Sequence, residues 1–158
     1  MRVILRPVQP DDEAFLYRLY AATRAAEVAQ WGWDPAQQEA FLHLQFRAHE
    51  QHYTVALPPA DQQIVECDGA AVGRMIVVRH ERAIVLADIA LLPAARNAGL
   101  GTQLITALLA EAAAACTPVR LHVALGNPAL RLYQRLGFAI LADNGTHYFM
   151  EKPAPATY

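Results

Sequence analysis

The sequence predicts an α/β domain in which helices flank a mixed, mostly antiparallel β-sheet. Two amphipathic helical patterns precede a β-rich hairpin pattern over residues 61–79. An apolar strand, a helix and a second strand follow over residues 83–125, and such a unit joins parallel strands by a right-handed crossover. A final hairpin pattern adds two antiparallel strands, so one parallel pair is expected within an otherwise antiparallel sheet.

The first part of the chain predicts a strand and two helices. The stretch VILRPVQPDD is typical of a short strand that runs into a helix N-cap at Asp11 or Asp12. The second helix is expected to begin at Pro35, because Asp34 and Gln37 form a capping-box pattern around it.

A hairpin and an apolar strand come next. Two β-rich runs meet at Asp68 and Gly69, a strong turn signal. The run AIVLADIALL, which Pro93 closes, is typical of a central strand covered on both faces. Asp88 is its only charged residue, and a carboxylate in such a strand is paired, lies at the strand margin or faces a cavity.

The rest of the chain predicts a helix, a strand, a short helix and a closing hairpin. VRLHVAL alternates as a half-buried strand does, and FAIL pairs with HYFMEK. Between them, Asn127 and Pro128 start a short helix that Gly137 ends. The first of these helices has an apolar stripe of Leu100, Leu104, Ala107 and Leu108. No repeat or linker is found, so residues 1–152 are expected to form one domain and residues 153–158 a loose tail.

Composition excludes several classes of protein. The net charge of −2 argues against a nucleic-acid partner held by phosphate contacts. Two cysteines, Cys67 and Cys116, provide neither a disulfide framework nor a four-cysteine zinc site, and the histidines lack metal-ligand spacing, so no metal is expected. No stretch has the length of a secretory signal or a membrane span, which predicts a cytoplasmic protein without a membrane partner.

The hexapeptide RNAGLG, residues 96–101, lies between the apolar strand and the following helix. A glycine-containing loop at a helix N-terminus directs backbone N–H groups outward and suits an anion such as phosphate. The dinucleotide fingerprint fails because Leu104 replaces its third glycine, and the Walker loop fails because no Gly-Lys-Ser/Thr occurs.

The remaining pattern, Arg96-x-x-Gly99-x-Gly101, resembles the acetyl-CoA pyrophosphate loop of the GNAT superfamily of N-acetyltransferases. A second stretch, NPALRLYQRLGF, resembles that family's second signature at Asn127, Ala129, Tyr133, Gly137 and Phe138. The order of elements is similar too, so the resemblance covers nearly the whole chain. It implies that the two parallel strands splay apart at the centre of the sheet and hold the pantetheine arm between them.

The resemblance implies acetyl-CoA as cosubstrate and a set of residues that bind it. The loop amides and Arg96 would hold the phosphates, the backbone of residues 89–92 would pair with the pantetheine arm, and Asn127 would hydrogen-bond to it. The implied cosubstrate-binding residues are Ile89, Ala90, Leu91, Leu92, Arg96, Asn97, Ala98, Gly99, Leu100, Gly101, Thr102, Asn127 and Tyr133.

Tyr133 and Asp88 are the catalytic candidates. Tyr133 lies on the apolar stripe of its helix, so it either packs in the core or, as the resemblance implies, protonates the leaving thiolate. Asp88 is the preferred base for the acceptor ammonium, and a backbone N–H near Leu91 or Leu92 would stabilise the oxyanion. The other candidate bases are Glu66, Glu27 and His122, of which the histidine is better explained by a structural hydrogen bond.

The expected reaction is direct attack of a primary amine on acetyl-CoA in a ternary complex. The resemblance places the acceptor pocket in the second-helix region, which contains Trp31, Trp33, Phe41 and Phe46. Core packing is the better explanation for any one of these rings, and Trp33, beside a helix cap, is the preferred acceptor-binding residue. A small-molecule acceptor is preferred. The alternatives are a protein N-terminus or lysine, an aminoacyl-tRNA, or a non-catalytic acyl-CoA-binding domain, and the sequence is compatible with a homodimer.

Overall fold

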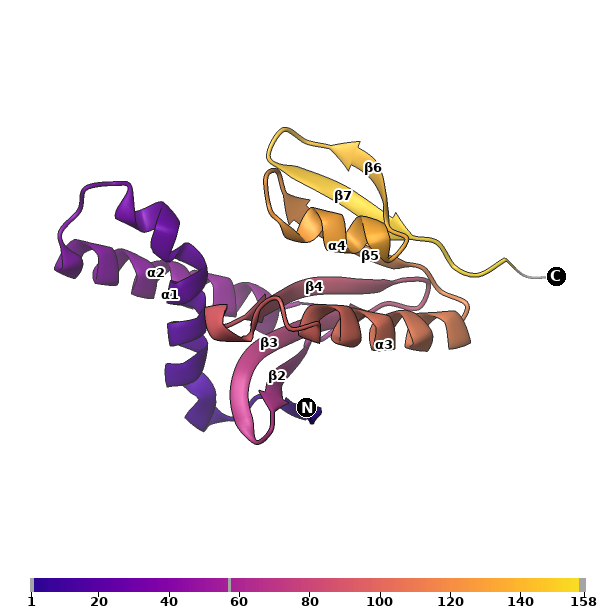
Figure 1. Cartoon of the computed structure of the whole chain (residues 1–158), viewed down its shortest axis with the longest axis horizontal. Helices are drawn as coiled ribbons and strands as arrows, with labels where there is room; N and C mark the ends of the chain where they lie inside the picture. The colour runs from indigo at the N-terminus through magenta and orange to yellow at the C-terminus, as the bar shows by residue number, and fades with distance from the viewer. Residues whose placement is uncertain (1, 57, 157–158) are drawn as a thin grey trace. The chain divides into compact units, whose positions relative to one another are not determined.

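The secondary structure follows the predicted order of elements. A computed structural model describes residues 2–56 and 58–156 of the chain (Figure 1). Within these residues the helices are α1 (Glu13–Ala29), α2 (Pro35–Thr54), α3 (Leu100–Ala114) and α4 (Ala129–Arg135), with short 3-10 turns at Pro10–Asp12 and Pro93–Ala95. The strands are β1 (Val3–Pro7), β2 (Asp61–Cys67), β3 (Ala70–Arg79), β4 (Ile84–Leu91), β5 (Val119–Ala124), β6 (Ala139–Asp143) and β7 (His147–Lys152).

The sheet confirms the predicted fold class. Its strand order is β1-β2-β3-β4-β5-β7-β6. The β4–β5 pair is parallel, with Ile84 opposite Val119, whereas β1–β2, β5–β7 and β6–β7 are antiparallel. The mixed, mostly antiparallel sheet is therefore observed, and the splaying of its parallel pair stays a prediction.

The chain forms two compact units, which we describe separately. The first contains the residues up to Ile76 together with Asp88–Arg96, and the second contains Val77–Ala87 together with the chain from Asn97 onward. Strands β3 and β4 each contribute residues to both units. The single-domain boundary at residue 152 stays a prediction.

Two helices and the start of the sheet build the first unit. Figure 1 shows α1 and α2, in indigo and purple, joined by a turn. Leu16 of α1, Phe46 of α2 and Ile64 of β2 form one buried hydrophobic cluster. The Phe46 ring is thus part of the core. Asp68 and Gly69 both have positive φ, which confirms the tight turn predicted between β2 and β3.

The two helix starts differ from each other. At α2 the capping box is confirmed, because Gln37 N donates to Asp34 Oδ1 at 2.9 Å and Asp34 N donates to Gln37 Oε1 at 3.2 Å. At α1 the predicted cap is only partly correct. Asp12 occupies the cap position, but its carboxylate accepts hydrogen bonds from Gln9 N and, at two oxygens, from the Arg6 guanidinium. The ion pair with β1 takes the place of the helix cap.

The second unit packs α3 and α4 with strands β5–β7. The alternation predicted for β5 is confirmed, with Val119, Leu121 and Val123 buried. The predicted stripe on α3 is wrong at one position: Ala107 is exposed and Ile105 is buried. The closing hairpin forms as predicted and carries a bulge in β6 between Ile140 and Ala142.

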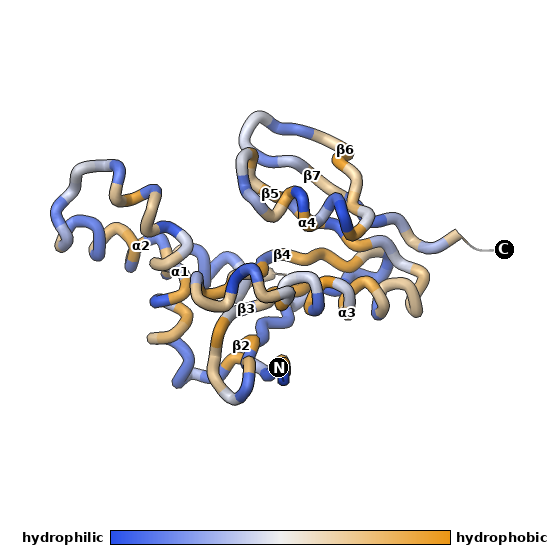
Figure 2. The backbone as a smooth tube through the Cα atoms, in the orientation of Figure 1, coloured by the Kyte–Doolittle hydropathy of each residue, from blue (hydrophilic) through white to orange (hydrophobic). Residues whose placement is uncertain are grey.

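Strand β4 is covered less completely than its composition predicts. Figure 2 shows it as a largely hydrophobic stretch, whereas hydrophilic and hydrophobic residues alternate along α2. Ile84 and Leu86 are buried, but residues 87–91 are only half-buried. The expectation of a strand covered on both faces therefore holds for the beginning of β4 and fails for its end, where the candidate site residues lie.

Candidate active site

The loop between β4 and α3 has the backbone geometry that its glycines predict. Gly99 is the N-cap of α3 and has a φ of 82°, a left-handed conformation that costs other residues about 1–2 kcal/mol. Asn97 also has a positive φ, of 61°. The first hydrogen bond of α3 runs from Gln103 N to Gly99 O at 3.0 Å. The amides of residues 100–102 therefore form the open, positive end of the helix.

Gly101 lies inside the first turn of α3, and its φ is not left-handed. A Cβ atom at this position would lie 3.4 Å from Leu132 Cδ2, an ordinary contact. Leu100 is buried and anchors the loop, whereas Ala98 and Thr102 are exposed. Backbone conformation thus requires only Gly99 of the pair, and Gly101 leaves the start of the helix free of a side chain.

Leu91 directs both of its backbone groups away from β3. The N–H of the next residue, Leu92, donates to Val72 O at 2.8 Å. Because successive residues of a strand direct their hydrogen-bonding groups to opposite edges, the N–H and C=O of Leu91 point away from β3. Of the two oxyanion donors that the sequence predicts, the one on Leu92 is already occupied. The C=O of Leu91 accepts a hydrogen bond from Arg96 Nε at 3.0 Å.

Strand β3 approaches the end of β4 closely at Gly73. A Cβ atom on Gly73 would lie 2.5 Å from Ala90 O and 2.6 Å from Leu91 Cδ2. Both distances are well below van der Waals contact. Glycine is therefore needed at this position so that β3 can support residues 90 and 91 of β4.

A buried polar cluster lies next to Gly73 on β3 and extends to α2 and β2. Arg74 of β3 has a side chain only 4% exposed. Its two terminal nitrogens donate to the Glu50 carboxylate of α2, Nη1 to Oε1 and Nη2 to Oε2, the latter at 2.7 Å, and Nη2 also donates to Gln62 Oε1 of β2. Among the described residues, the Arg74 Nε atom has no hydrogen-bond partner. A fully buried arginine is thus neutralised by one carboxylate.

His49 and Tyr53 of α2 extend this cluster. His49 Nδ1 lies 3.6 Å from Glu50 Oε1, which is an electrostatic contact rather than a hydrogen bond. The rings of His49 and Tyr53 meet edge to face, with centroids 5.0 Å apart. Burial raises the pKa of the Tyr53 phenol to about 12, and the charge of Asp88 contributes to this shift.

The charges of the cluster act on Asp88. Burial raises the pKa of the Asp88 carboxyl above its ordinary value; His49 and Arg74 oppose this shift, and Glu50 adds to it. For Glu50, burial also disfavours the ionised form, but its contacts with Arg74 and His49 prevail and hold its pKa at about 2. Of the two carboxyl groups, that of Asp88 therefore binds a proton more readily than that of Glu50.

The other candidate bases have different surroundings. Glu66 is held by Arg6 at 2.8 Å, and Glu27 is held by Arg24 at 2.8 Å on the surface of α1. His122 is exposed on β5, and its ring centroid lies 5.1 Å from that of Phe149. The carboxylates of both glutamates are thus engaged in ion pairs.

Asn127 and Tyr133 lie at the start and inside of α4. Pro128, not Asn127, occupies the N-cap position of α4, but Asn127 Oδ1 accepts from Ala129 N at 2.9 Å and so satisfies the first amide of the helix, as a cap would. Tyr133 is 7% exposed and packs its ring against Phe138 at 5.7 Å. The ring therefore belongs to the core of the second unit, and the role of its hydroxyl stays a prediction.

Trp33 lies near the surface, as the sequence predicts, but it does not lie alone. It is 40% exposed, and its ring makes edge contacts with Trp31 at 5.1 Å and with Phe41 at 5.4 Å. Trp31 and Phe41 also contact each other, at 5.2 Å. These three rings form one aromatic cluster beside the α1–α2 turn, and its part in acceptor binding stays a prediction.

Comparison with known protein families gives a match over most of the chain. The sequence profile of the acetyltransferase (GNAT) family matches residues 14–138, which include all of α1 except Glu13, the loop and all of α4. The chain belongs to this family of acetyltransferases. A comparison with curated protein sequences gave no significant match.

Solved structures share the fold of this GNAT acetyltransferase. PaiA N-acetyltransferase from Thermoplasma acidophilum, in complex with coenzyme A, is 16% identical over 97% of this chain and 99% of its own, with a TM-score of 0.73. A histone acetyltransferase HPA2-related protein from Corynebacterium glutamicum is 22% identical over 99% of both chains, with a TM-score of 0.70. A GNAT acetyltransferase from Elizabethkingia anophelis with acetyl-CoA bound is 14% identical over 96% of this chain and 97% of its own, with a TM-score of 0.64.

The sequence reasoning missed the polar cluster of this acetyltransferase. Its members are His49, Glu50, Tyr53, Gln62 and Arg74, which come from α2, β2 and β3. One signal was present: Arg74 interrupts the apolar run of β3 in the same way that Asp88 interrupts that of β4. Two opposite charges in two neighbouring apolar strands indicate a shared polar site.

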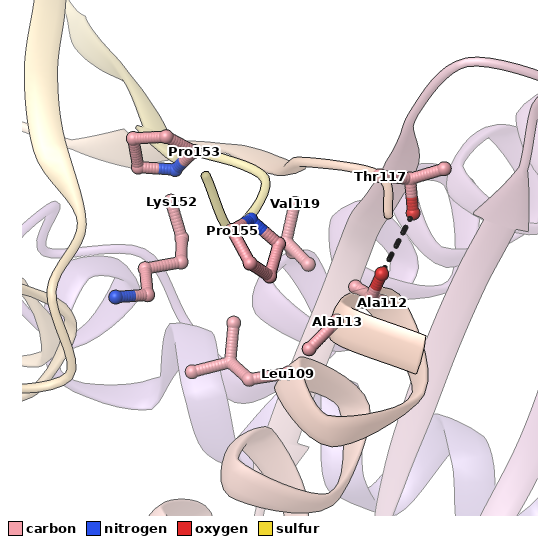
Figure 3. Close-up of a pocket in the computed structure, with 8 residues that line it drawn as sticks. All are labelled: Leu109, Ala112, Ala113, Thr117, Val119, Lys152, Pro153 and Pro155. Carbon is pink, nitrogen blue, oxygen red and sulfur yellow. Dashed lines mark hydrogen bonds between the residues drawn. The ribbon is translucent and has the colours of Figure 1, made fainter. Parts of the chain in front are cut away.

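A small cavity in the second unit of the acetyltransferase lies away from the predicted site residues. It has a volume of about 50 Å³, and Figure 3 shows Pro153 and Pro155 facing Leu109 and Ala113 of α3 across it. This volume is far below the roughly 300 Å³ or more of typical ligand pockets. The cavity is a packing gap where the chain leaves β7.

Two further searches concern metals and membranes. Nowhere in residues 2–56 and 58–156 do three His, Cys, Asp or Glu side chains gather as metal ligands. Among the same residues, no helix has both the length and the apolar character needed to cross a bilayer.

Proposed function

We propose that this chain transfers the acetyl group of acetyl-CoA to a primary amine of a small molecule, by direct attack in a ternary complex. The loop at residues 96–102 carries the proposal, because the left-handed Gly99 opens the amides at the start of α3 to an anion. Relatives whose structures hold coenzyme A or acetyl-CoA support the same donor.

Binding of the donor uses backbone and side-chain groups. The amides of residues 99–102 hold the pyrophosphate, and Arg96 adds a positive charge beside them. The C=O of Leu91 points away from β3, and beside its hydrogen bond from Arg96 Nε it has a second lone pair that accepts from an amide of the pantetheine arm. The Leu91 N–H is left for the reacting carbonyl. Asn127 reaches the same arm with its amide nitrogen, since its Oδ1 is engaged in capping α4. Most of these contacts come from the backbone, which is why the neighbouring side chains are apolar.

Two side chains move protons in the reaction. The acceptor ammonium gives a proton to the Asp88 carboxylate, and the neutral amine then attacks the thioester carbonyl. A C–N bond forms, the oxyanion takes a hydrogen bond from the Leu91 N–H, and the C–S bond breaks. The leaving thiolate takes the proton of the Tyr133 hydroxyl, and the acylated nitrogen gives its second proton through water to the Tyr133 phenolate, so that a neutral amide and a neutral phenol remain. The raised pKa of Asp88 supports its role as base, because a more basic carboxylate takes the ammonium proton more readily.

The proposed acceptor and location rest on the aromatic cluster and on the cysteines. Trp33, in the aromatic cluster, supports an acceptor with an apolar or aromatic body. The free thiols Cys67 and Cys116 fit a reducing cytoplasm, where the reaction is placed. A homodimer remains compatible with the chain.

Ligand-induced stabilisation tests the donor. A ligand at 100 times its Kd stabilises the fold by about 2.7 kcal/mol, which raises Tm by about 5–10 °C for a chain of this size. We expect this shift with acetyl-CoA and CoA and no shift with NAD or ATP. The Arg96→Glu variant should lose it, whereas Arg82→Glu, a matched exposed arginine in the β3–β4 turn, should keep it. A shift with NAD or ATP instead would refute the proposal.

Thiol release tests the reaction and its acceptor. With a panel of small primary amines, the parent should release CoA, and Tyr133→Phe should slow turnover while the CoA-induced Tm shift is unchanged. Turnover only with peptides or aminoacyl-tRNA would replace the small-molecule acceptor by those classes. Donor binding without turnover on any amine would indicate an acyl-CoA-binding domain.

A further inference from the structure

The Arg74–Glu50 pair has no part in the proposed reaction, yet it lies within the charge cluster that acts on Asp88. Arg74 is almost fully buried in β3, and both of its terminal nitrogens donate to Glu50. A buried ion pair of this kind contributes little net stability, because the loss of hydration offsets most of the Coulomb attraction. Arg74 lies on β3, the strand next to the β4 strand that carries Asp88, and it follows Gly73, which closely approaches Ala90 and Leu91 of β4. This position calls for an explanation in terms of charge.

The titratable groups around Asp88 come from two elements. Helix α2 provides His49, Glu50 and Tyr53, and strand β3 provides Arg74. Gln62 of β2 completes the set of Arg74 partners without adding a charge. Arg74 and Glu50 act on Asp88 with opposite signs: the guanidinium favours the carboxylate form, and the Glu50 carboxylate disfavours it.

An unpaired guanidinium on β3, the strand next to that of Asp88, would change the base. An opposite charge within about 4–6 Å lowers a carboxyl pKa by about 1–3 units, and a carboxylate stabilised in this way is a poorer proton acceptor. Glu50 prevents this, because both terminal nitrogens of Arg74 are turned toward α2 and its charge is balanced there.

We propose that Glu50 is a positioning residue: by holding and neutralising Arg74, it leaves Asp88 basic enough to take the proton of the acceptor ammonium. The inference rests on the proposed role of Asp88. The ammonium proton passes to the Asp88 carboxylate and is later released to water, so the pair is unchanged over a cycle. His49 faces the same cluster with a side chain 31% exposed, and it accounts for part of the positive influence on Asp88.

The direct test is a carboxyl titration of Asp88 by ¹³C NMR in the ligand-free protein, with Asp88→Asn providing the assignment. Glu50→Gln should lower the Asp88 pKa by about 1 unit, because Arg74 loses its partner charge. Arg74→Met should raise the pKa. The double variant, Glu50→Gln with Arg74→Met, leaves no lone buried charge and should return it close to the parent value. Glu50→Asp, which keeps the charge, should also stay close to the parent.

A matched control comes from the second unit. Arg79 holds Glu111 through two hydrogen bonds, at 2.6 and 2.9 Å, in an exposed pair of the same composition. Glu111→Gln should leave the Asp88 titration unchanged. An unchanged titration in Glu50→Gln, or shifts of the same sign in Glu50→Gln and Arg74→Met, would overturn the inference. If Glu50→Gln does not fold, the Arg74→Met and double variants decide by the same criterion.

The rate profile then separates this inference from the proposed function. In the parent, the acid limb of kcat/KM against pH should follow the Asp88 titration, and in Glu50→Gln it should move to lower pH together with it, with a lower plateau in kcat. A titration that moves as expected while Asp88→Asn retains full activity would contradict Asp88 as the base and leave the charge coupling intact. A titration that does not move contradicts the coupling whatever the activity.

Discussion

The close approach of β3 to β4 at Gly73 gives the sharpest structural prediction. In Gly73→Ala the new methyl group would lie 2.5 Å from Ala90 O and 2.6 Å from Leu91 Cδ2. Carbon–oxygen contacts between neighbouring strands stop at about 3.3 Å, so the Ala90 carbonyl must move by about 0.8 Å. The second atom belongs to a side chain and can rotate, but the first belongs to the backbone and cannot.

The expected loss follows from these two contacts. Overpacking of a tight site costs about 1–3 kcal/mol. The hydrogen bond from Leu92 N to Val72 O, next to the clash, is now 2.8 Å, and its disruption adds about 0.5–1.5 kcal/mol. We therefore expect Gly73→Ala to lower the free energy of unfolding by about 3 kcal/mol. The same displacement should weaken CoA binding, because it moves the backbone of Leu91.

Urea denaturation followed by fluorescence of the two tryptophans, both in the first unit, measures the change. Gly69→Ala is the control, because a Cβ at Gly69 meets nothing within 4 Å and only its left-handed backbone costs about 1 kcal/mol. Adding Leu91→Ala to Gly73→Ala should not restore stability, since the backbone clash remains. A Gly73→Ala variant within about 0.5 kcal/mol of the parent would refute the reasoning, since surface changes alone reach that size.

Two further predictions concern the loop and the N-terminal ion pair. Gly99→Ala should destabilise the chain by about 1 kcal/mol because of its positive φ, whereas Gly101→Ala should be neutral or stabilise it by about 0.5 kcal/mol; equal losses in urea denaturation would contradict this. The Arg6 pair lowers the pKa of Asp12 from 3.8 to about 2. A carboxyl whose pKa is lower in the folded state than in the unfolded state stabilises the fold at pH values above its unfolded-state pKa. Asp12→Asn should therefore lower the free energy of unfolding by about 1–2 kcal/mol at pH 7. This difference should vanish as the pH falls from about 4 to 2. A difference that stays constant with pH would exclude the ion pair as its source.

Local sequence signals predicted the fold well. The capping box of Asp34 and Gln37, the Asp68-Gly69 turn and the alternation in β5 each depend on residues within a few positions of one another, and all were confirmed. The loop between β4 and α3 was predicted for the same reason, because the left-handed backbone at Gly99 favours a glycine at that position.

Contacts between distant residues could not be predicted in this way. Asp12 bonds to Arg6 of β1 rather than capping α1, because an ion pair with a neighbouring strand outweighs a local cap. Arg74 finds its partner 24 residues away in α2, and no pattern within β3 specifies that partner. Asp88 was identified as unusual by its apolar neighbours, but the groups that govern its charge became evident only from the packing of α2 on the sheet.

The hydrogen bond between Arg96 and the Leu91 carbonyl bears on the conformational entropy that Arg96 would lose in the anion binding that we propose. Immobilising a long side chain during binding costs about 0.5–1.5 kcal/mol. Arg96 loses part of this freedom when the chain folds, because its Nε is already fixed on Leu91 O at 3.0 Å. The bond uses only one of the five donors of the guanidinium, so the terminal nitrogens stay open while the side chain is held. Arg96 is thus already held in place by the fold, whereas a flexible arginine would lose this freedom only on binding the anion that we propose.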